Sequence, residues 1–228
     1  MFKLFENFPQ VTCGISNKAD GAMSLSDENL SENFRVYFQK LGIQKRQIVR
    51  AGVGHKARVV KVNAQHGGQV IANCDGLYTD SKKLCLALTV ADCYPIYFFD
   101  PQSRAAGLAH CGWRGCVSEL ILNMVGAFQS DPGRILAGVG PGIGACHFEI
   151  QDDIKTSFEN FPGAIMRRGR KIFVNLPLII KAQLASAGIK PENIEFAGEC
   201  TYCEPDRYFS FRRDKPAKIQ GLAAYISL

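Results

Sequence analysis

The sequence predicts a mixed α/β fold (α+β type) in a single compact domain that spans residues 1–228. The chain has 228 residues, 46% of them apolar, which is enough to bury a large core. No low-complexity block or linker divides it. Strand-like and helix-like apolar patterns occur along the whole chain, but they do not alternate regularly as βαβ units do.

Charge and composition limit the classes of partner. The formal net charge is +6, and the basic residues are scattered except for a cluster at 167–171, which we interpret as a solvated loop. Nucleic acid is therefore not an expected partner. No apolar run approaches the roughly 20 residues of a membrane helix, and residues 1–6 lack a signal-peptide core. We expect a soluble, cytoplasmic protein with no membrane partner.

The chain contains nine cysteines. An odd number in a chain of this size indicates reduced thiols rather than a disulfide framework. Cys200-x-x-Cys203 has the spacing of a zinc-binding pair, but no second cysteine or cysteine/histidine pair at finger spacing completes it. The sequence therefore favours packing as the role of Cys200 and Cys203.

The first third of the chain predicts short strands around one helix. Apolar runs indicate strands over 9–14, 58–62 and 69–72, and His66 lies at a glycine-rich bend between the last two. Ser26-Asp27-Glu28 is typical of a helix start, and Gly42 follows the helix. The apolar face of that helix is expected to contain Leu30, Phe34, Phe38 and Leu41. Residues 75–80 are predicted to form a loop, and the unbroken apolar run 84–90 predicts a strand buried on both faces.

A β-hairpin is predicted directly after that strand. Residues 94–99 and 104–109 are strand-like, and the turn-forming residues 100–103 separate them. Closure there makes the numbers of facing residues sum to 203, so Cys93 is expected to face His110 at a Cβ separation of about 4.5–5.5 Å. Such a pair can form a thiolate nucleophile, bind a metal, or simply be buried at a strand end. The polar exit Gly112-Trp113-Arg114-Gly115 favours a substrate-binding turn over a core.

The remainder of the chain predicts alternating helices and strands. Residues 117–128 have a helical apolar stripe, and the strand 135–139 leads into Gly140-Pro141-Gly142-Ile143-Gly144, which can approach a ligand closely or form a tight turn. Further helices are expected over 149–161 and 176–187. Further strands are expected over 171–174, 194–197, 208–211 and 223–227.

These motifs together resemble the laccase-domain family, which is named for multicopper polyphenol oxidases and associated with purine nucleoside phosphorolysis. The match runs from about residue 66 to the C-terminus and is loose over the first 60 residues. The motifs are His66-Gly67, Thr89-x-Ala91-Asp92-Cys93-x-Pro95, Ala109-His110-x-Gly112-Trp113-Arg114-Gly115, Gly140-Pro141-x-Ile143, Phe148-Glu149-Ile150, Cys200-Thr201-Tyr202 and Ser210-Phe211-Arg212-Arg213-Asp214.

The resemblance implies a compact domain with mixed sheets flanked by helices, and a zinc ion bound by His66, Cys93 and His110. Two histidines and a thiolate suit zinc, and three protein ligands leave the open position of a catalytic site. Magnesium prefers harder ligands. Copper is possible, but four histidines in the whole chain cannot build the several histidine clusters of a multicopper oxidase.

Three functions from different classes fit these residues. The first is a zinc-dependent purine nucleoside phosphorylase with accessory adenosine deaminase activity, in which Cys93, His110 and Arg114 are catalytic. Trp113, Arg114 and Gly142 would then bind purine nucleoside and inorganic phosphate. The second is a hydrolase that uses Cys93 and His110 to edit cytoplasmic peptidoglycan precursors. The third is a non-catalytic zinc-binding protein.

Several polar residues have two open interpretations. Asp92 either orients a histidine ligand or caps a strand end, and Glu149 is either a general acid/base or a helix-start carboxylate. For Arg212 and Arg213 the sequence favours pairing with carboxylates over binding of substrate phosphate. His55 and His147 match no ligand motif.

Overall fold

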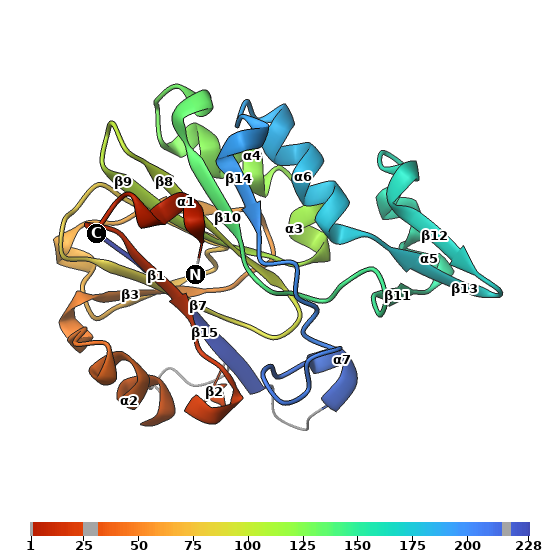
Figure 1. Cartoon of the computed structure of the whole chain (residues 1–228), viewed down its shortest axis with the longest axis horizontal. Coiled ribbons are helices and arrows are strands. Elements are labelled where there is room, and N and C mark those ends of the chain that lie inside the picture. The colour runs from red at the N-terminus through yellow and green to blue at the C-terminus, as the bar shows by residue number, and fades with distance from the viewer. Residues whose placement is uncertain (1, 25–31, 216–219) are drawn as a thin grey trace.

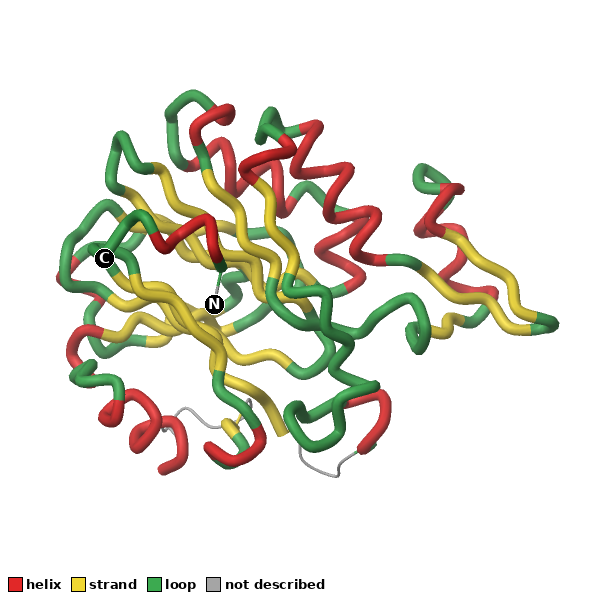
Figure 2. The backbone as a smooth tube through the Cα atoms, in the orientation of Figure 1, coloured by secondary structure: helices red, strands yellow, loops and turns green. Residues whose placement is uncertain are grey.

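Two six-stranded sheets stacked face to face form the centre of the molecule, and helices cover both outer faces (Figure 1, Figure 2). The structure is a computed structural model that describes residues 2–24, 32–215 and 220–228. One sheet has the order β1-β15-β7-β3-β5, with β2 paired to β15. The other has the order β14-β10-β8-β9-β6-β4. Both mix parallel and antiparallel pairs, as the predicted mixed sheets require.

The strands and helices have the following bounds. The first sheet contains β1 (Thr12–Ile15), β2 (Met23–Ser24), β3 (Ile48–Gly52), β5 (Val70–Ala72), β7 (Cys85–Val90) and β15 (Gln220–Ser227). The second contains β4 (Val59–Lys61), β6 (Gly76–Thr79), β8 (Tyr94–Asp100), β9 (Ala105–Cys111), β10 (Leu136–Val139) and β14 (Ile194–Phe196). A smaller antiparallel sheet contains β11 (Glu149–Ile150), β12 (Ile165–Arg168) and β13 (Lys171–Val174). The α-helices are α1 (Lys3–Glu6), α2 (Glu32–Lys40), α3 (Trp113–Val117), α4 (Leu120–Ala127), α5 (Asp152–Lys155), α6 (Leu176–Ser186) and α7 (Phe211–Asp214).

The central strands are apolar on both faces because each face has a cover. Along β7, Leu86 and Leu88 point into the core between the two sheets, whereas Cys85 and Ala87 point toward α2. The predicted burial of this strand on both faces is therefore confirmed. On the outer face of the second sheet, α3, α4 and α6 close a separate core against β8, β9 and β10. No helix in the described ranges has the length and apolarity needed to cross a bilayer.

The small sheet β11-β13-β12 projects from the side of the sandwich together with α5, where Figure 1 shows it at the right. The basic cluster 167–171 is exposed as predicted, but it is the tip of a hairpin rather than a loop, because Arg167 and Arg168 end β12 and Lys171 begins β13. A helix over 149–161 was the wrong expectation for this region. The segment contains β11, the short α5 and a 3-10 turn, and only Ile150 and Phe158 of its apolar residues are fully buried.

Three other expectations are also wrong. Residues 76–79 are not a loop but the interior strand β6, because Leu77 is buried between the sheets and Tyr78 packs on the helical side. Residues 208–211 do not form a strand but lead into α7. In α2, Phe34 and Phe38 are buried as predicted, whereas Leu41 lies beyond the helix end and is 40% exposed. The predicted helix start at 26–28, and Leu30, lie outside the described residues.

The predicted hairpin forms, but its register differs by two residues. Tyr94 pairs with Cys111 and Pro95 with His110, so facing numbers sum to 205. The turn is 101–104, because Arg104 adopts a positive φ of 54° and belongs to the loop rather than the strand. Continued by one residue, this register places Cys93 opposite Gly112, and His110 is its diagonal neighbour.

Candidate functional site

His110 lies near the end of β9, where it is buried. Its Nδ1 is 3.1 Å from the carbonyl oxygen of Thr89, and its Nε2 is buried without a hydrogen-bond partner. The pKa of His110 is lowered to about 4, mainly by burial and also by the nearby His55, whereas Asp75 and the hydrogen bond to Thr89 act in the opposite direction. A neutral ring that donates from Nδ1 to a carbonyl leaves the Nε2 lone pair free, which is the state of a histidine metal ligand.

Asp75 positions a second histidine beside this ring. Its buried carboxylate accepts hydrogen bonds from the backbone N–H groups of Gly54, His55 and Lys56 at 2.5–3.0 Å. The turn gives His55 a positive φ of 56° and sets its ring edge-on to that of His110, with centroids 5.5 Å apart. The sequence did not single out His55, because the contact depends on a tertiary turn that no spacing reveals.

Cys93 lies at the other strand of the hairpin, one residue before β8 begins. A Cβ placed on Gly112 would come within 2.6 Å of the Cys93 Sγ, so only glycine fits beneath the thiol. Burial raises the pKa of Cys93 to about 12; Cys111 and Asp92 act in the same direction, and Arg114 opposes them. A thiol of this kind is a poor nucleophile unless a cation displaces its proton.

His66 ends a 3-10 turn, Ala64–His66, which Asn63 caps. Its Nδ1 accepts a hydrogen bond from the Asn63 backbone N–H at 3.1 Å and also lies 3.0 Å from the Asn63 Oδ1, so the capping contacts hold the ring in place. The imidazole is half-buried. The sequence prediction of a bend at this position is confirmed.

The structure does not gather His66, Cys93 and His110 to ligand distance. Among the described residues, the metal-capable group whose ligand atoms all lie within 4.8 Å of one another is a different one. The register explains part of this difference, because diagonal neighbours in a ladder lie about 7–8 Å apart and only long or aromatic side chains span that separation. The unpartnered Nε2 of His110 nevertheless fits a metal ligand. The three-residue ligand set stays a prediction.

Trp113 and Arg114 form the exit of the hairpin as the first residues of α3. The Arg114 guanidinium lies 4.4 Å from the centroid of the indole ring and is exposed, and the indole itself lies 6.2 Å from Phe158. This stacked pair presents an aromatic edge and a positive charge to solvent beside Gly112. Such a surface suits a ligand with a planar base and an anionic group.

The surroundings of Gly142 are those of a close-packed backbone position rather than those of a phosphate-binding turn. It forms an isolated parallel β-bridge with Cys200, and its N–H points to the Glu199 carbonyl oxygen at 3.4 Å. A Cβ at this position would lie 2.6 Å from the ring of Tyr94. Glycine is therefore required here for close packing, and a role of Gly142 in substrate binding stays a prediction.

Asp92 connects the hairpin to the C-terminal segment. Its carboxylate accepts hydrogen bonds from the Thr201 hydroxyl at 2.6 Å and the Arg212 N–H at 2.7 Å, and neither bond involves a histidine. Its φ is +78°, which is costly for a non-glycine residue and is held by these contacts. Arg213 pairs with Asp214, as the sequence favoured, and also donates to the carbonyl oxygens of Thr201 and Tyr208.

The side chains of Glu149 and Arg212 also have partners within the protein. The Glu149 carboxylate forms an ion pair with Lys171 at 2.9 Å across the small sheet. The Arg212 guanidinium donates to the Glu149 carbonyl oxygen and lies 5.3 Å from the Phe148 ring centroid. Glu149 is the first residue of β11, so its interpretation as a helix-start carboxylate is wrong.

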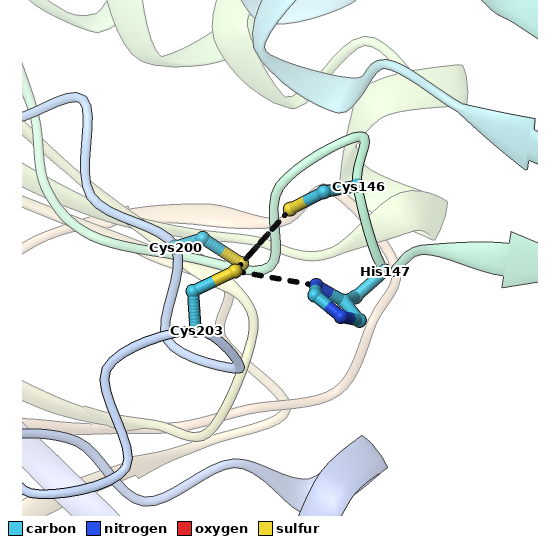
Figure 3. A group of neighbouring side chains, drawn as sticks. All are labelled: Cys146, His147, Cys200 and Cys203. Carbon is cyan, nitrogen blue, oxygen red and sulfur yellow. Dashed lines mark hydrogen bonds between the residues drawn. The ribbon is translucent and has the colours of Figure 1, made fainter.

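A second group of metal-capable side chains lies on two loops near Gly142. It consists of Cys146, His147, Cys200 and Cys203 (Figure 3). The Sγ of Cys146 lies 3.5 Å from that of Cys200 and 3.6 Å from that of Cys203. His147 Nδ1 lies 3.3 Å from the Cys203 Sγ. The sequence missed this group because Cys146 and His147 are adjacent rather than at finger spacing, so the packing interpretation of Cys200-x-x-Cys203 overlooked its neighbours.

The fold and these groups define a class: a mixed α/β sandwich that carries cysteine and histidine side chains suited to a metal ion. The family follows from comparison with known proteins. The chain belongs to the multi-copper polyphenol oxidoreductase laccase family, whose model matches residues 14–227. The resemblance identified in the sequence is thereby confirmed.

Individual relatives agree with this assignment. The chain is 27% identical to the purine nucleoside phosphorylase YlmD of Bacillus subtilis, over 98% of this chain and 90% of that protein. It is 34% identical to the YlmD of Geobacillus stearothermophilus over 73% of this chain and 66% of the relative. Among solved structures, the Bacillus licheniformis hypothetical protein YfiH superposes with a TM-score of 0.88 at 30% identity, covering 98% of this chain and 94% of that one.

Proposed function

We propose that the protein is a zinc-dependent purine nucleoside phosphorylase of the cytoplasm. It would convert adenosine, inosine and methylthioadenosine with inorganic phosphate to the free base and the (methylthio)ribose 1-phosphate. The names of the relatives support the reaction class. The observation that carries the proposal is the buried, neutral His110, whose Nε2 has no protein partner at the open end of the hairpin.

In this proposal His66, Cys93 and His110 hold the zinc ion. When bound, zinc supplies a Lewis acid and an activated water, which also accounts for an accessory deamination of adenosine. The Trp113 indole would stack against the purine, and the exposed Arg114 guanidinium would bind phosphate through charge-assisted hydrogen bonds. His55, set edge-on to His110, would orient that ring.

The geometry favours this function over the alternatives. A Cys93/His110 hydrolase needs a thiolate nucleophile, but burial raises the pKa of Cys93 to about 12, and no cation but a bound metal would displace that proton. Copper-dependent oxidation of polyphenols needs several histidine clusters, and the chain has four histidines in all. A non-catalytic zinc protein would have no use for an exposed Arg114 stacked on the partly buried Trp113.

The test is product chromatography with adenosine, inosine and methylthioadenosine, with and without phosphate. Loss of charge-assisted hydrogen bonds worth about 1.5–3 kcal/mol should lower phosphorolysis by Arg114→Ala about ten- to a hundredfold, and deamination less. His110→Ala should lose both activities. Arg134→Ala is the matched control, because Arg134 is a comparably exposed arginine in a surface ion pair away from this turn. Release of base at the same rate without phosphate would indicate hydrolysis, and no turnover in zinc-replete enzyme would contradict the purine assignment.

A further inference from the structure

We propose that Cys146, His147, Cys200 and Cys203 bind a structural zinc ion, distinct from the site at the hairpin end. The four residues come from two loops, one that follows β10 and one that follows β14 (Figure 3). Three thiolates and one imidazole are a standard ligand set for a closed, tetrahedral zinc site. Four protein ligands leave no open position, so the role is structural rather than catalytic.

The observed distances fit a tetrahedron around a zinc ion. With Zn–S bonds of about 2.3 Å and a Zn–N bond of about 2.0–2.1 Å, the S···S edges are about 3.8 Å and the S···N edges about 3.6 Å. The structure has S···S separations of 3.5 and 3.6 Å and an S···N separation of 3.3 Å. Along these three edges, binding requires an expansion of a few tenths of an ångström, and all four ligand atoms already lie within 4.8 Å of one another.

Backbone and ring contacts already orient the ligands. The Gly144 N–H donates to the Cys200 Sγ at 3.1 Å, which is the outer-shell contact that orients a metal-bound thiolate. The Cys203 N–H closes a turn onto the Cys200 carbonyl oxygen at 3.0 Å, so both ends of the Cys-x-x-Cys segment face the same point. The His147 ring stacks on Tyr202 at a centroid distance of 3.9 Å and an angle of 12°, with Nδ1 directed at Cys203.

Packing alone does not account for the group. Free cysteines are among the most buried residues in proteins, yet Cys203 is exposed and Cys146 and Cys200 are partly exposed. A disulfide would use two of the three thiols and give no role to the third or to His147. A metal ion uses all four side chains.

The zinc would join the loop that carries Gly142 to the segment that anchors Asp92. The Gly142–Cys200 bridge lies on one side of the group, and Thr201, which donates to Asp92, follows Cys200 directly. The ion would therefore fix the C-terminal segment against the strand that leads into Cys93. This role does not depend on the proposed reaction.

Cobalt substitution of the full-length protein tests the site. Reduced protein is stripped with chelator and titrated with Co²⁺, and thiolate-to-cobalt charge-transfer absorbance is recorded. Wild type and Cys13→Ser, a matched change of a partly buried thiol outside the group, should give the same intense absorbance. Cys203→Ser should lose most of it and bind the metal at least about a hundredfold more weakly, since even outer-shell changes cost 10–100-fold. Because Cys203 is exposed, its substitution leaves packing intact, which circular dichroism verifies.

Two outcomes would overturn the proposal. One is an unchanged cobalt spectrum and zinc content in Cys203→Ser. The other is a disulfide within the group, found by peptide mapping of protein purified with zinc and without reductant. His110→Ala should retain the thiolate spectrum apart from the contribution of Cys93, so failure of the hairpin-end site is distinguishable from failure of this one.

Discussion

The hairpin-end residues and the loop group are both built from cysteine and histidine, but the fold assembles them in opposite ways. At the hairpin end, His110 is buried on a central strand and its Nε2 has no hydrogen-bond partner. On the loops, four partly exposed side chains already converge on one point. The first arrangement suits a catalytic metal site with an open coordination position. The second arrangement suits a structural metal site, in which four protein ligands hold two segments together.

The largest effect that separates the two groups is on stability as a function of pH. His110 has a native pKa of about 4, against 6.5 for an unperturbed histidine, so the unfolded state binds the proton more readily between these values. The contribution of His110 to the free energy of unfolding is therefore fully present above about pH 6.5. It falls by about 3 kcal/mol as the pH drops to about 4. Urea unfolding of chelator-treated protein across this range measures the slope.

Matched variants assign that slope to one region. His110→Gln should flatten it, whereas His147→Gln, which changes a half-buried histidine of the loop group, should leave it unchanged. An equal slope in His110→Gln and wild type would mean that the buried histidine does not control the acid sensitivity.

The next effect concerns the turn that supports the hairpin end. Asp75→Asn removes the charge that accepts three backbone hydrogen bonds, and bonds to a charged group are worth about 1.5–3 kcal/mol, so we expect about 2 kcal/mol of destabilisation. Asp80→Asn, at an exposed ion pair with Lys61, should cost less than about 1 kcal/mol. Urea midpoints at one pH compare the two. Similar urea midpoints for the two variants would show that Asp75 does not stabilise the turn that contains His55.

The smallest effect tests the close approach beneath Cys93. In Gly112→Ala the new Cβ would meet the Cys93 Sγ at 2.6 Å, so the thiol must move, at a cost of about 1–2 kcal/mol. Gly126→Ala is the control, because its Cβ would meet nothing within 4 Å and alanine favours a helix by about 0.5–1 kcal/mol. Thermal unfolding should therefore shift in opposite directions. If Gly112→Ala is neutral, the thiol is not held where the structure places it.

The same comparison explains what the sequence could and could not predict. The hairpin, the doubly buried strand 85–90 and the position of His110 at a strand end follow from local patterns, and all are observed. The register was wrong by two residues because turn residues 100–104 allow more than one closure, and the positive φ of Arg104 decides between them. A shift of two keeps each side chain on its own face, so the residues involved were still the right ones to examine.

The histidines that the sequence set aside show the limit of such patterns. His55 reaches His110 only through the turn that Asp75 organises, and His147 reaches Cys203 from 56 positions away in the chain. Neither contact produces a periodic pattern in the amino-acid sequence. The cue that could have found the loop group was the adjacent Cys146-His147 pair in the glycine-rich segment after β10, considered together with Cys200-x-x-Cys203.

The most direct test of two separate metal sites is elemental analysis of zinc in four proteins purified in parallel under reducing conditions. These are the wild type, His110→Ala, Cys203→Ser and the double variant. Wild type should contain about two zinc ions per chain, each single variant about one, and the double variant almost none. About one zinc in wild type that Cys203→Ser alone removes would contradict the site at the hairpin end. About one zinc ion in wild type that is lost in His110→Ala but kept in Cys203→Ser would contradict the site on the loops.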